Sequence, residues 1–248
     1  MSDQVLVTDD GGVRVIRMNR PEKKNALTQP MYTAMTAALD EAGTNDAIRC
    51  IVIAGTPGAF CAGSDIGDFQ KRAEGGLEPV TIGFLHALAR NQKPLVAAVG
   101  GIAVGIGTTM LLHCDHVVAA TGVAFSTPFI RLGLIPEAAS SLLAPQRMGH
   151  ARAFALLVMG RPLPVEDAKA AGLVNTIVDA AAVDDTAMQA AREIETLPPG
   201  AVALARSLMR DNADTVTARI DSEAAHFQDR LKSDEARAAF AAFFARKK

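Results

Sequence analysis

Two glycine-rich segments are the places where this sequence could support chemistry. They are residues 60–65 (FCAGSD) and 104–107 (VGIG), and each follows an apolar run and precedes a helical pattern. The first turn of a helix leaves its backbone N–H groups without partners, so such turns offer free donors. Two donors aimed at one oxygen would stabilise a carbonyl that gains negative charge, whereas two ordinary strand-to-helix turns are the alternative.

One acidic residue could act beside such donors. Glu137 lies in TPFIRLGLIPEAASS (residues 127–141), with Phe129, Leu134 and Ile135 as apolar neighbours. A glutamate in an apolar pocket has a raised pKa, so it can take and return a proton near neutral pH. The alternative is structural, because acidic residues are favoured where a helix begins and an Ala/Ser/Leu segment follows.

Other chemical signatures are weaker. Asp65 and Asp68 are rival acids, but Asp65 stands where a helix N-cap is expected. The run HCDH (residues 113–116) contains potential metal ligands, yet neighbouring side chains diverge in any regular element, so a helix end entering a strand is the better interpretation. The GxG at residues 105–107 lacks the third glycine of a dinucleotide-binding motif. We therefore expect neither a metal nor a cofactor.

The elements that would position these residues alternate between strand and helix. Uninterrupted apolar runs, typical of strands covered on both faces, occupy residues 50–54, 95–99, 116–120 and 173–178. Helical patterns occupy residues 28–42 and 79–91 and the segment after Gly105. An alternating pattern around a DGG turn in residues 5–15 predicts an opening hairpin. This order predicts an α/β fold with crossover connections.

The C-terminal part differs, because the strand pattern stops after about residue 180 and alanine-rich helical segments follow, including residues 222–247. Phe240, Phe243 and Phe244 cluster near the end. We expect a core domain of residues 1–190 and a helical region of residues 191–248 that covers either its own core or a neighbouring subunit. Residues 72–78 (RAEGGLE) are expected to form a mobile loop.

Composition argues against several classes of function. The 248 residues include 25 Lys and Arg against 27 Asp and Glu, a net charge of −2, so nucleic acid is an unexpected partner. Three cysteines without CxxC spacing favour a reducing, cytoplasmic compartment, and the N-terminal residues do not resemble a signal peptide. The uncharged stretch 94–112 is long enough to span a bilayer, but its glycines favour a buried strand, a turn and a helix, so no membrane role is expected.

Several motifs in order resemble the crotonase (enoyl-CoA hydratase/isomerase) superfamily. They are NRP (residues 19–21), NAL (25–27), AFCAGSD (59–65), KPLVAAV (93–99), CD (114–115) and AKAAGLV (168–174). The resemblance implies a spiral of ββα units with a C-terminal helical trimerisation region, assembled as homotrimers or dimers of trimers. It also implies acyl-CoA thioester substrates, with CoA as part of the substrate rather than a cofactor.

The resemblance also assigns site residues by position. The backbone N–H groups of Ser64 and Ile106 would form the oxyanion hole. Substrate-binding positions fall on Lys23, Lys24, Ala62, Asp65, Ile66, Gly105 and Phe129.

The chain departs from the hydratases of this superfamily at two positions. Thr109 and Phe129 stand where those enzymes carry glutamates, so hydration loses both its base and its acid. The run TPFxxLGxxPExxSS, together with VGI at residues 104–106, is instead similar to the peroxisomal-type Δ3,Δ2-enoyl-CoA isomerases. That branch has one catalytic glutamate, at the position of Glu137.

The resemblance therefore implies an enoyl-CoA isomerase of fatty acid metabolism (β-oxidation) that shifts a double bond through a dienolate. Glu137 would move the proton between C2 and C4. Another reaction of the superfamily (hydration, hydrolysis or decarboxylation) is one alternative. A catalytically silent acyl-CoA-binding subunit is the other. The acyl chain length and the pathway stay open.

Overall fold

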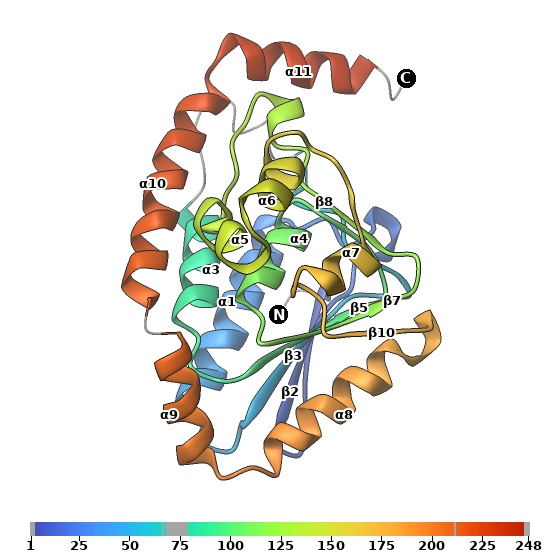
Figure 1. Cartoon of the computed structure of the whole chain (residues 1–248), viewed down its shortest axis with the longest axis vertical. Helices are drawn as coiled ribbons and strands as arrows, with labels where there is room; N and C mark the ends of the chain where they lie inside the picture. Colours follow the sequence, from blue (N-terminus) through green and yellow to red (C-terminus); the bar gives the residue numbers. More distant parts are fainter. Residues whose placement is uncertain (1–2, 66, 68–78, 211, 246–248) are drawn as a thin grey trace.

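The computed structural model describes residues 3–65, 67, 79–210 and 212–245 (Figure 1). In this part of the chain the larger sheet has the strand order β1-β2-β3-β5-β7-β10. The β1–β2 pair is antiparallel, as the predicted hairpin requires, and the other pairs are parallel. The strands are β1 (Val5–Asp10), β2 (Val13–Met18), β3 (Cys50–Ala54), β5 (Leu95–Val99), β7 (His116–Ala120) and β10 (Thr176–Val178).

Four short strands form a second sheet in the order β4-β6-β8-β9. They are β4 (Gly58–Cys61), β6 (Gly101–Val104), β8 (Ala124–Ser126) and β9 (Leu163–Pro164). After β3, β5 and β7 the chain turns and adds its next strand to this smaller sheet, and helical segments follow. This repetition of two strands and a helical segment confirms the predicted α/β fold with crotonase-like ββα units.

Helices cover both sheets. The α-helices are α1 (Gln29–Thr44), α3 (Pro79–Arg90), α4 (Ile106–Thr109), α5 (Ser140–Met148), α6 (His150–Leu157), α7 (Val165–Ala170), α8 (Val183–Glu195), α9 (Pro199–Met209), α10 (Ala213–Leu231) and α11 (Asp234–Ala245). The 3-10 helices are η1 (Pro21–Lys23), η2 (Met110–His113), η3 (Ile130–Leu132) and η4 (Ala180–Ala182). Helix α8 packs against β3, β5 and β7, so every residue of β3 and β5 is buried, as their apolar runs predict.

The C-terminal helices form an outer layer. Figure 1 shows α9 and α10 along one side of the molecule and α11 across its end. The helix predicted over residues 222–247 is two helices, since α10 ends at Leu231 and α11 begins at Asp234. The strand predicted over residues 173–178 is shorter, with only its last three residues in β10. The predicted domain boundary at residue 190 stays a prediction.

Two other expectations concern membrane and loop segments. The uncharged stretch 94–112 forms β5, β6, α4 and most of η2, and no helix in the described ranges is long and apolar enough to cross a bilayer. The loop predicted at residues 72–78 lies outside the described residues.

Candidate active site

The two glycine-rich turns lie side by side because β4 and β6 are neighbouring parallel strands. Each turn follows the carboxyl end of its strand, and parallel strands bring those ends to one edge of a sheet. The contact is close: a Cβ atom built on Gly105 would lie 3.8 Å from the Cα atom of Gly63. The convergence that the sequence left open is therefore present in the structure.

Both turns depend on glycine conformations. Gly63 has φ 96°, and Gly105 has φ 55° and ψ −122°. Residues with a Cβ atom rarely adopt these backbone conformations. The N–H group of Gly105 donates to the carbonyl of Ser126. Among the backbone hydrogen bonds of turns, loops and caps in the described residues, none is donated by the N–H group of Ser64 or Ile106. Ile106 is also the first residue of α4, where backbone donors lack helical partners.

The side chain of Ser64 is occupied elsewhere. Its Oγ atom lies 2.7 Å from the hydroxyl oxygen of the buried Tyr32, and the two hydroxyls share a hydrogen bond. Only the backbone N–H group of Ser64 is thus available to the space between the turns.

Glu137 lies half-buried in the wall of a cavity of about 500 Å³ that both turns also line. Its Oε1 atom accepts a hydrogen bond of 2.5 Å from the hydroxyl of Thr109 on α4. Loss of hydration raises the pKa of Glu137 to about 8. The Thr109 hydrogen bond opposes this rise, and the charge of Glu223 adds to it.

The rest of the cavity wall is mainly apolar, because the C-terminal helices close it. Phe227 from α10 and Phe240 and Phe243 from α11 line the cavity together with Phe129 and Leu134. Phe129, Leu134 and Phe227 belong to one apolar cluster, and Phe240 packs against it. Phe240 and Phe243 thus line a cavity of their own chain, while the side chain of Phe244 lies outside the described residues. A contact of this helical region with a neighbouring subunit stays a prediction.

Glu137 does not begin a helix, so the structural alternative for this residue is wrong in its detail. Helix α5 begins three residues later, at Ser140. The two residues between them, Ala138 and Ala139, are buried and left-handed, with φ 60° and 54°. A left-handed alanine costs roughly 1–2 kcal/mol, so surrounding contacts must hold this turn.

The predicted substrate-binding residues divide into two groups. Ala62, Gly105 and Phe129 line the cavity. Lys23, Lys24 and Asp65 do not line it, although the carbonyl of Lys24 accepts a hydrogen bond from Ala62 N–H (2.9 Å).

The Asp65 carboxylate pairs with Arg20 (2.6 Å) and accepts the N–H of Gly67, so it stabilises the turn. Ile66 lies outside the described residues. Ile135, predicted as a pocket residue, does not line the cavity. It packs against the apolar cluster that includes Phe129, Leu134 and Phe227.

Sequence reasoning missed the role of Thr109 as a partner of Glu137, and it also missed Glu223. Thr109 was noted only as the replacement of a family glutamate, yet its position four residues after Gly105 places it in the same helical turn as the free donors. For Glu223 the sequence has no local signal, since it stands 86 positions after Glu137 in an ordinary helical pattern.

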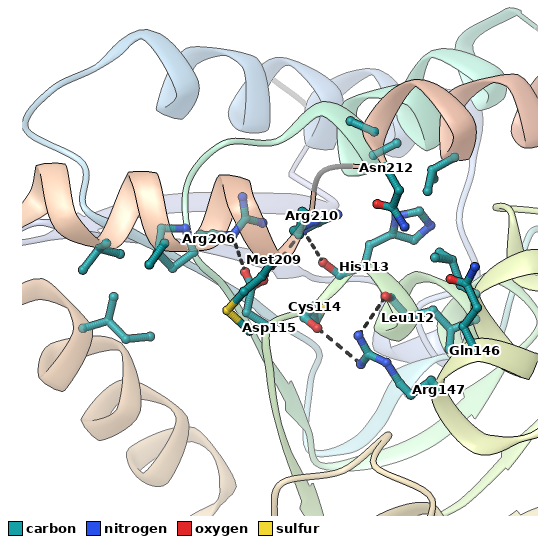
Figure 2. A pocket seen from close by; sticks show the side chains of 18 residues that line it. Leu112, His113, Cys114, Asp115, Gln146, Arg147, Arg206, Met209, Arg210 and Asn212 are labelled. Carbon is teal, nitrogen blue, oxygen red and sulfur yellow. Dashed lines mark hydrogen bonds and ion pairs between the residues drawn. The ribbon is translucent and has the colours of Figure 1, made fainter.

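A second cavity of about 500 Å³ lies between α9, α10 and the start of β7. Figure 2 shows Arg206 and Arg210 reaching it from the α9 side and Arg147 from α5. Its carboxylate, Asp115, pairs with Arg206 (2.8 Å) and accepts the N–H of Leu95 (2.8 Å). The carboxylate of Asp115 is therefore engaged by an ion pair and by a backbone N–H group.

Among the residues that resembled metal ligands, His113 and Cys114 are buried, His116 is half-buried and Asp115 is exposed. The Nε2 atom of His113 bonds to the carbonyl of Ala138, and burial lowers the pKa of His113 to about 4, so its ring is neutral. In the described part of the chain no three His, Cys, Asp or Glu side chains are grouped to hold a metal ion.

Comparisons with known proteins agree with this geometry. The family model for enoyl-CoA hydratase/isomerase matches residues 8–248. The chain belongs to the enoyl-CoA hydratase/isomerase family. It is 31% identical over 255 residues to the Escherichia coli (strain K12) 1,2-epoxyphenylacetyl-CoA isomerase, covering 100% of this chain and 97% of the relative.

A second relative of this family is enoyl-CoA delta isomerase 2 of Rattus norvegicus, 35% identical over 254 residues. The match covers 99% of this chain but 64% of the rat protein, so the chain spans less than two thirds of that relative. Among solved structures, Pseudomonas aeruginosa OdaA superposes with a TM-score of 0.93 at 40% identity, covering 98% of this chain and 99% of OdaA. The chain is thus a crotonase-family acyl-CoA enzyme.

Proposed function

We propose that this enzyme is a Δ3,Δ2-enoyl-CoA isomerase that uses Glu137 as its one base and acid. The observation that carries the proposal is the surroundings of that carboxyl group. Among the described residues that line the cavity, Glu137 is the single acid, and it shares an apolar wall with the two glycine turns. A double-bond shift needs one proton carrier and a site for an enolate oxygen, and both are available here.

In the proposed reaction the Glu137 carboxylate takes a proton from C2 of a 3-enoyl-CoA. The electron pair of that C–H bond becomes part of a dienolate, whose negative charge lies mainly on the thioester oxygen. The N–H groups of Ser64 and Ile106 would donate to that oxygen, which lowers the barrier to enolisation. Glu137 then returns the proton to C4, and the product is the 2-enoyl-CoA.

The raised pKa of Glu137 supports the first half of this cycle, the removal of the C2 proton. A carboxyl group with a pKa of about 8 holds its proton more firmly than an exposed glutamate, so it is a stronger base towards a carbon acid. Only the ionised form can start the reaction. We therefore expect kcat/KM to rise with pH and to level off above about pH 8.

The substrate would be an acyl-CoA thioester, and no separate cofactor enters these steps. Seating of CoA along Lys23, Lys24, Ala62, Asp65 and Ile66 stays a prediction from the family. So do the homotrimer or dimer of trimers and the cytoplasmic location.

The test is turnover of a 3-enoyl-CoA, followed by the ultraviolet absorbance of the conjugated 2-enoyl thioester that forms. Hydration is the competing reaction, so the same protein is incubated with a 2-enoyl-CoA and the mixture is analysed for the 3-hydroxy product. Exchange of the C2 proton with D₂O, followed by NMR, separates an enzyme from a silent binding subunit. Absence of both isomerisation and exchange would contradict the proposal.

A further inference from the structure

The turn after Glu137 needs support from elsewhere in the fold. Ala138 and Ala139 connect Glu137 to α5, and both adopt the left-handed conformation that alanine disfavours. Their dihedral angles determine where the preceding carboxyl group points. Any contact that holds this turn therefore also holds Glu137 in the cavity wall.

Glu223 on α10 makes that contact through both of its oxygen atoms. Its Oε2 atom accepts the N–H of Ala139 (2.6 Å), and its Oε1 atom accepts the N–H (3.0 Å) and the hydroxyl (2.5 Å) of Ser141. Arg219, one helical turn earlier, donates to the same hydroxyl (3.1 Å). Glu223 is only 5% exposed, and a buried carboxylate is rare unless its oxygens are satisfied.

A second buried side chain holds the other end of the turn. The carbonyl of Ala138 accepts the Nε2–H of His113, at 2.8 Å. His113 is buried on η2, whereas Glu223 belongs to the outer layer of C-terminal helices. The turn is thus fixed between two layers of the fold.

We propose that Glu223 is a positioning residue for Glu137, and that α10 thereby holds the proton-transferring carboxyl group in the cavity. The inference rests on the proposed role of Glu137. Glu223 does not line the cavity, so it acts through Ala139 and Ser141 rather than on the substrate.

The charge of Glu223 has a second consequence. It contributes to the raised pKa of Glu137, so its removal should lower that pKa. The titratable and charged groups close to Glu137 or to its supporting turn include Cys61 on β4, His113 on η2, Arg131 on η3, and Arg219 and Glu223 on α10. Burial raises the pKa of Cys61 to about 12 and lowers that of His113 to about 4, so neither changes charge near pH 8. Burial also raises the pKa of Glu223 itself, against its hydrogen bonds.

The test compares Glu223→Gln with Asp229→Asn, which removes one negative charge from an exposed position on the same helix. A glutamine has only one side-chain oxygen, so its NH₂ group would face the N–H of Ala139 or of Ser141, and that hydrogen bond would be lost. We expect folded Glu223→Gln to lose about tenfold to a hundredfold in kcat with little change in KM. The rise of kcat/KM with pH, which reports the ionisation of Glu137, should occur at lower pH in Glu223→Gln. Asp229→Asn should match the wild type in both respects.

A ¹³C NMR titration of the Glu137 carboxyl group, assigned by its loss in Glu137→Gln, separates this inference from the proposed function. If the wild type fails to isomerise a 3-enoyl-CoA, the function is wrong, and a shift of the Glu137 midpoint in Glu223→Gln still supports the positioning role. An unmoved midpoint with a wild-type kcat would overturn it. Should Glu223→Gln fail to fold, Ser141→Ala removes one of the three bonds, and wild-type values of both quantities would again refute the role.

Discussion

Two cavities of similar volume, about 500 Å³ each, contain carboxyl groups with different neighbours. The neighbours of each carboxyl group determine whether it is suited to proton transfer or to an ion pair. Glu137 faces apolar side chains and one hydroxyl, and its pKa rises to about 8. Asp115 faces arginines instead, with Arg206 at 2.8 Å and Arg210 at 3.8 Å (Figure 2). The first carboxyl group is the proposed proton carrier, and the second links Arg206 on α9 to the backbone N–H of Leu95 on β5.

Glu137→Gln tests the reactive half of this comparison and should have the largest effect. The amide keeps the shape but cannot accept the C2 proton, so kcat for a 3-enoyl-CoA should fall by about 10²–10⁴-fold. Binding of an unreactive acyl-CoA, measured by calorimetry, should persist. A wild-type rate in this variant would remove Glu137 from the mechanism.

Gly105→Ala tests the donors that face Glu137. An alanine at φ 55° and ψ −122° is strained, so the turn should shift and misplace the Ile106 N–H. Loss of one such donor reduces kcat by about a hundredfold or more. Gly122→Ala is a matched control, because Gly122 also has a positive φ, with open space around it and no place in the cavity. Equal kcat losses in the two variants would show a general loss of folding instead.

Asp115→Asn tests the structural half. Removing the charge leaves Arg206 without its anion, and at this partly exposed pair we expect a loss of about 1–2 kcal/mol in the free energy of unfolding. The kcat for a 3-enoyl-CoA should stay within about twofold of the wild type, since Asp115 does not line the reactive cavity. Urea denaturation and steady-state kinetics measure the two effects, and a large kcat loss at unchanged stability would break the comparison.

The stability of the protein should depend on pH through Glu137. The folded-state pKa of Glu137 is raised above its unfolded value, so its contribution is most favourable below about pH 4.5 and is lost as pH rises to about 8. Glu137→Gln removes this loss and should be more stable than the wild type at pH 8. Thermal melts of both proteins at pH 5 and pH 8 measure the stability difference between the variant and the wild type. If this difference were the same at both pH values, the raised pKa of Glu137 would be contradicted.

Thr109→Val should have a small effect on turnover but a distinct effect on its pH dependence. Its hydroxyl stabilises the ionised form of Glu137, so its loss should raise the Glu137 pKa further and move the acid limb of kcat/KM to higher pH. At pH 7 we expect a loss of a few-fold, about the strength of one hydrogen bond. The opposite shift expected for Glu223→Gln makes the pair informative, because general damage would not move the two profiles in opposite directions.

Strands β3 and β5 of the larger sheet were predictable because each is an uninterrupted run of five apolar residues. The smaller sheet was missed because its strands have two to four residues, which is too short for a periodic pattern. The surroundings of Glu137 were also not predictable from its local sequence. Its sequence neighbours resemble a helix start, but contacts with His113 and Glu223 hold the next two residues in a conformation that local preference disfavours.

The sequence by itself determined the family, the alternation of strands and helices, and the candidates Glu137, Ser64 and Ile106. These features reside in residue types and their order along the chain. Only the tertiary structure decided that Thr109 and Glu223 support Glu137 and that Asp115 pairs with Arg206. The partners of Glu223 lie more than 80 positions earlier, and their approach depends on how α10 packs over α5. Burial and hydrogen bonding, which set the pKa of a carboxyl group, follow from that packing.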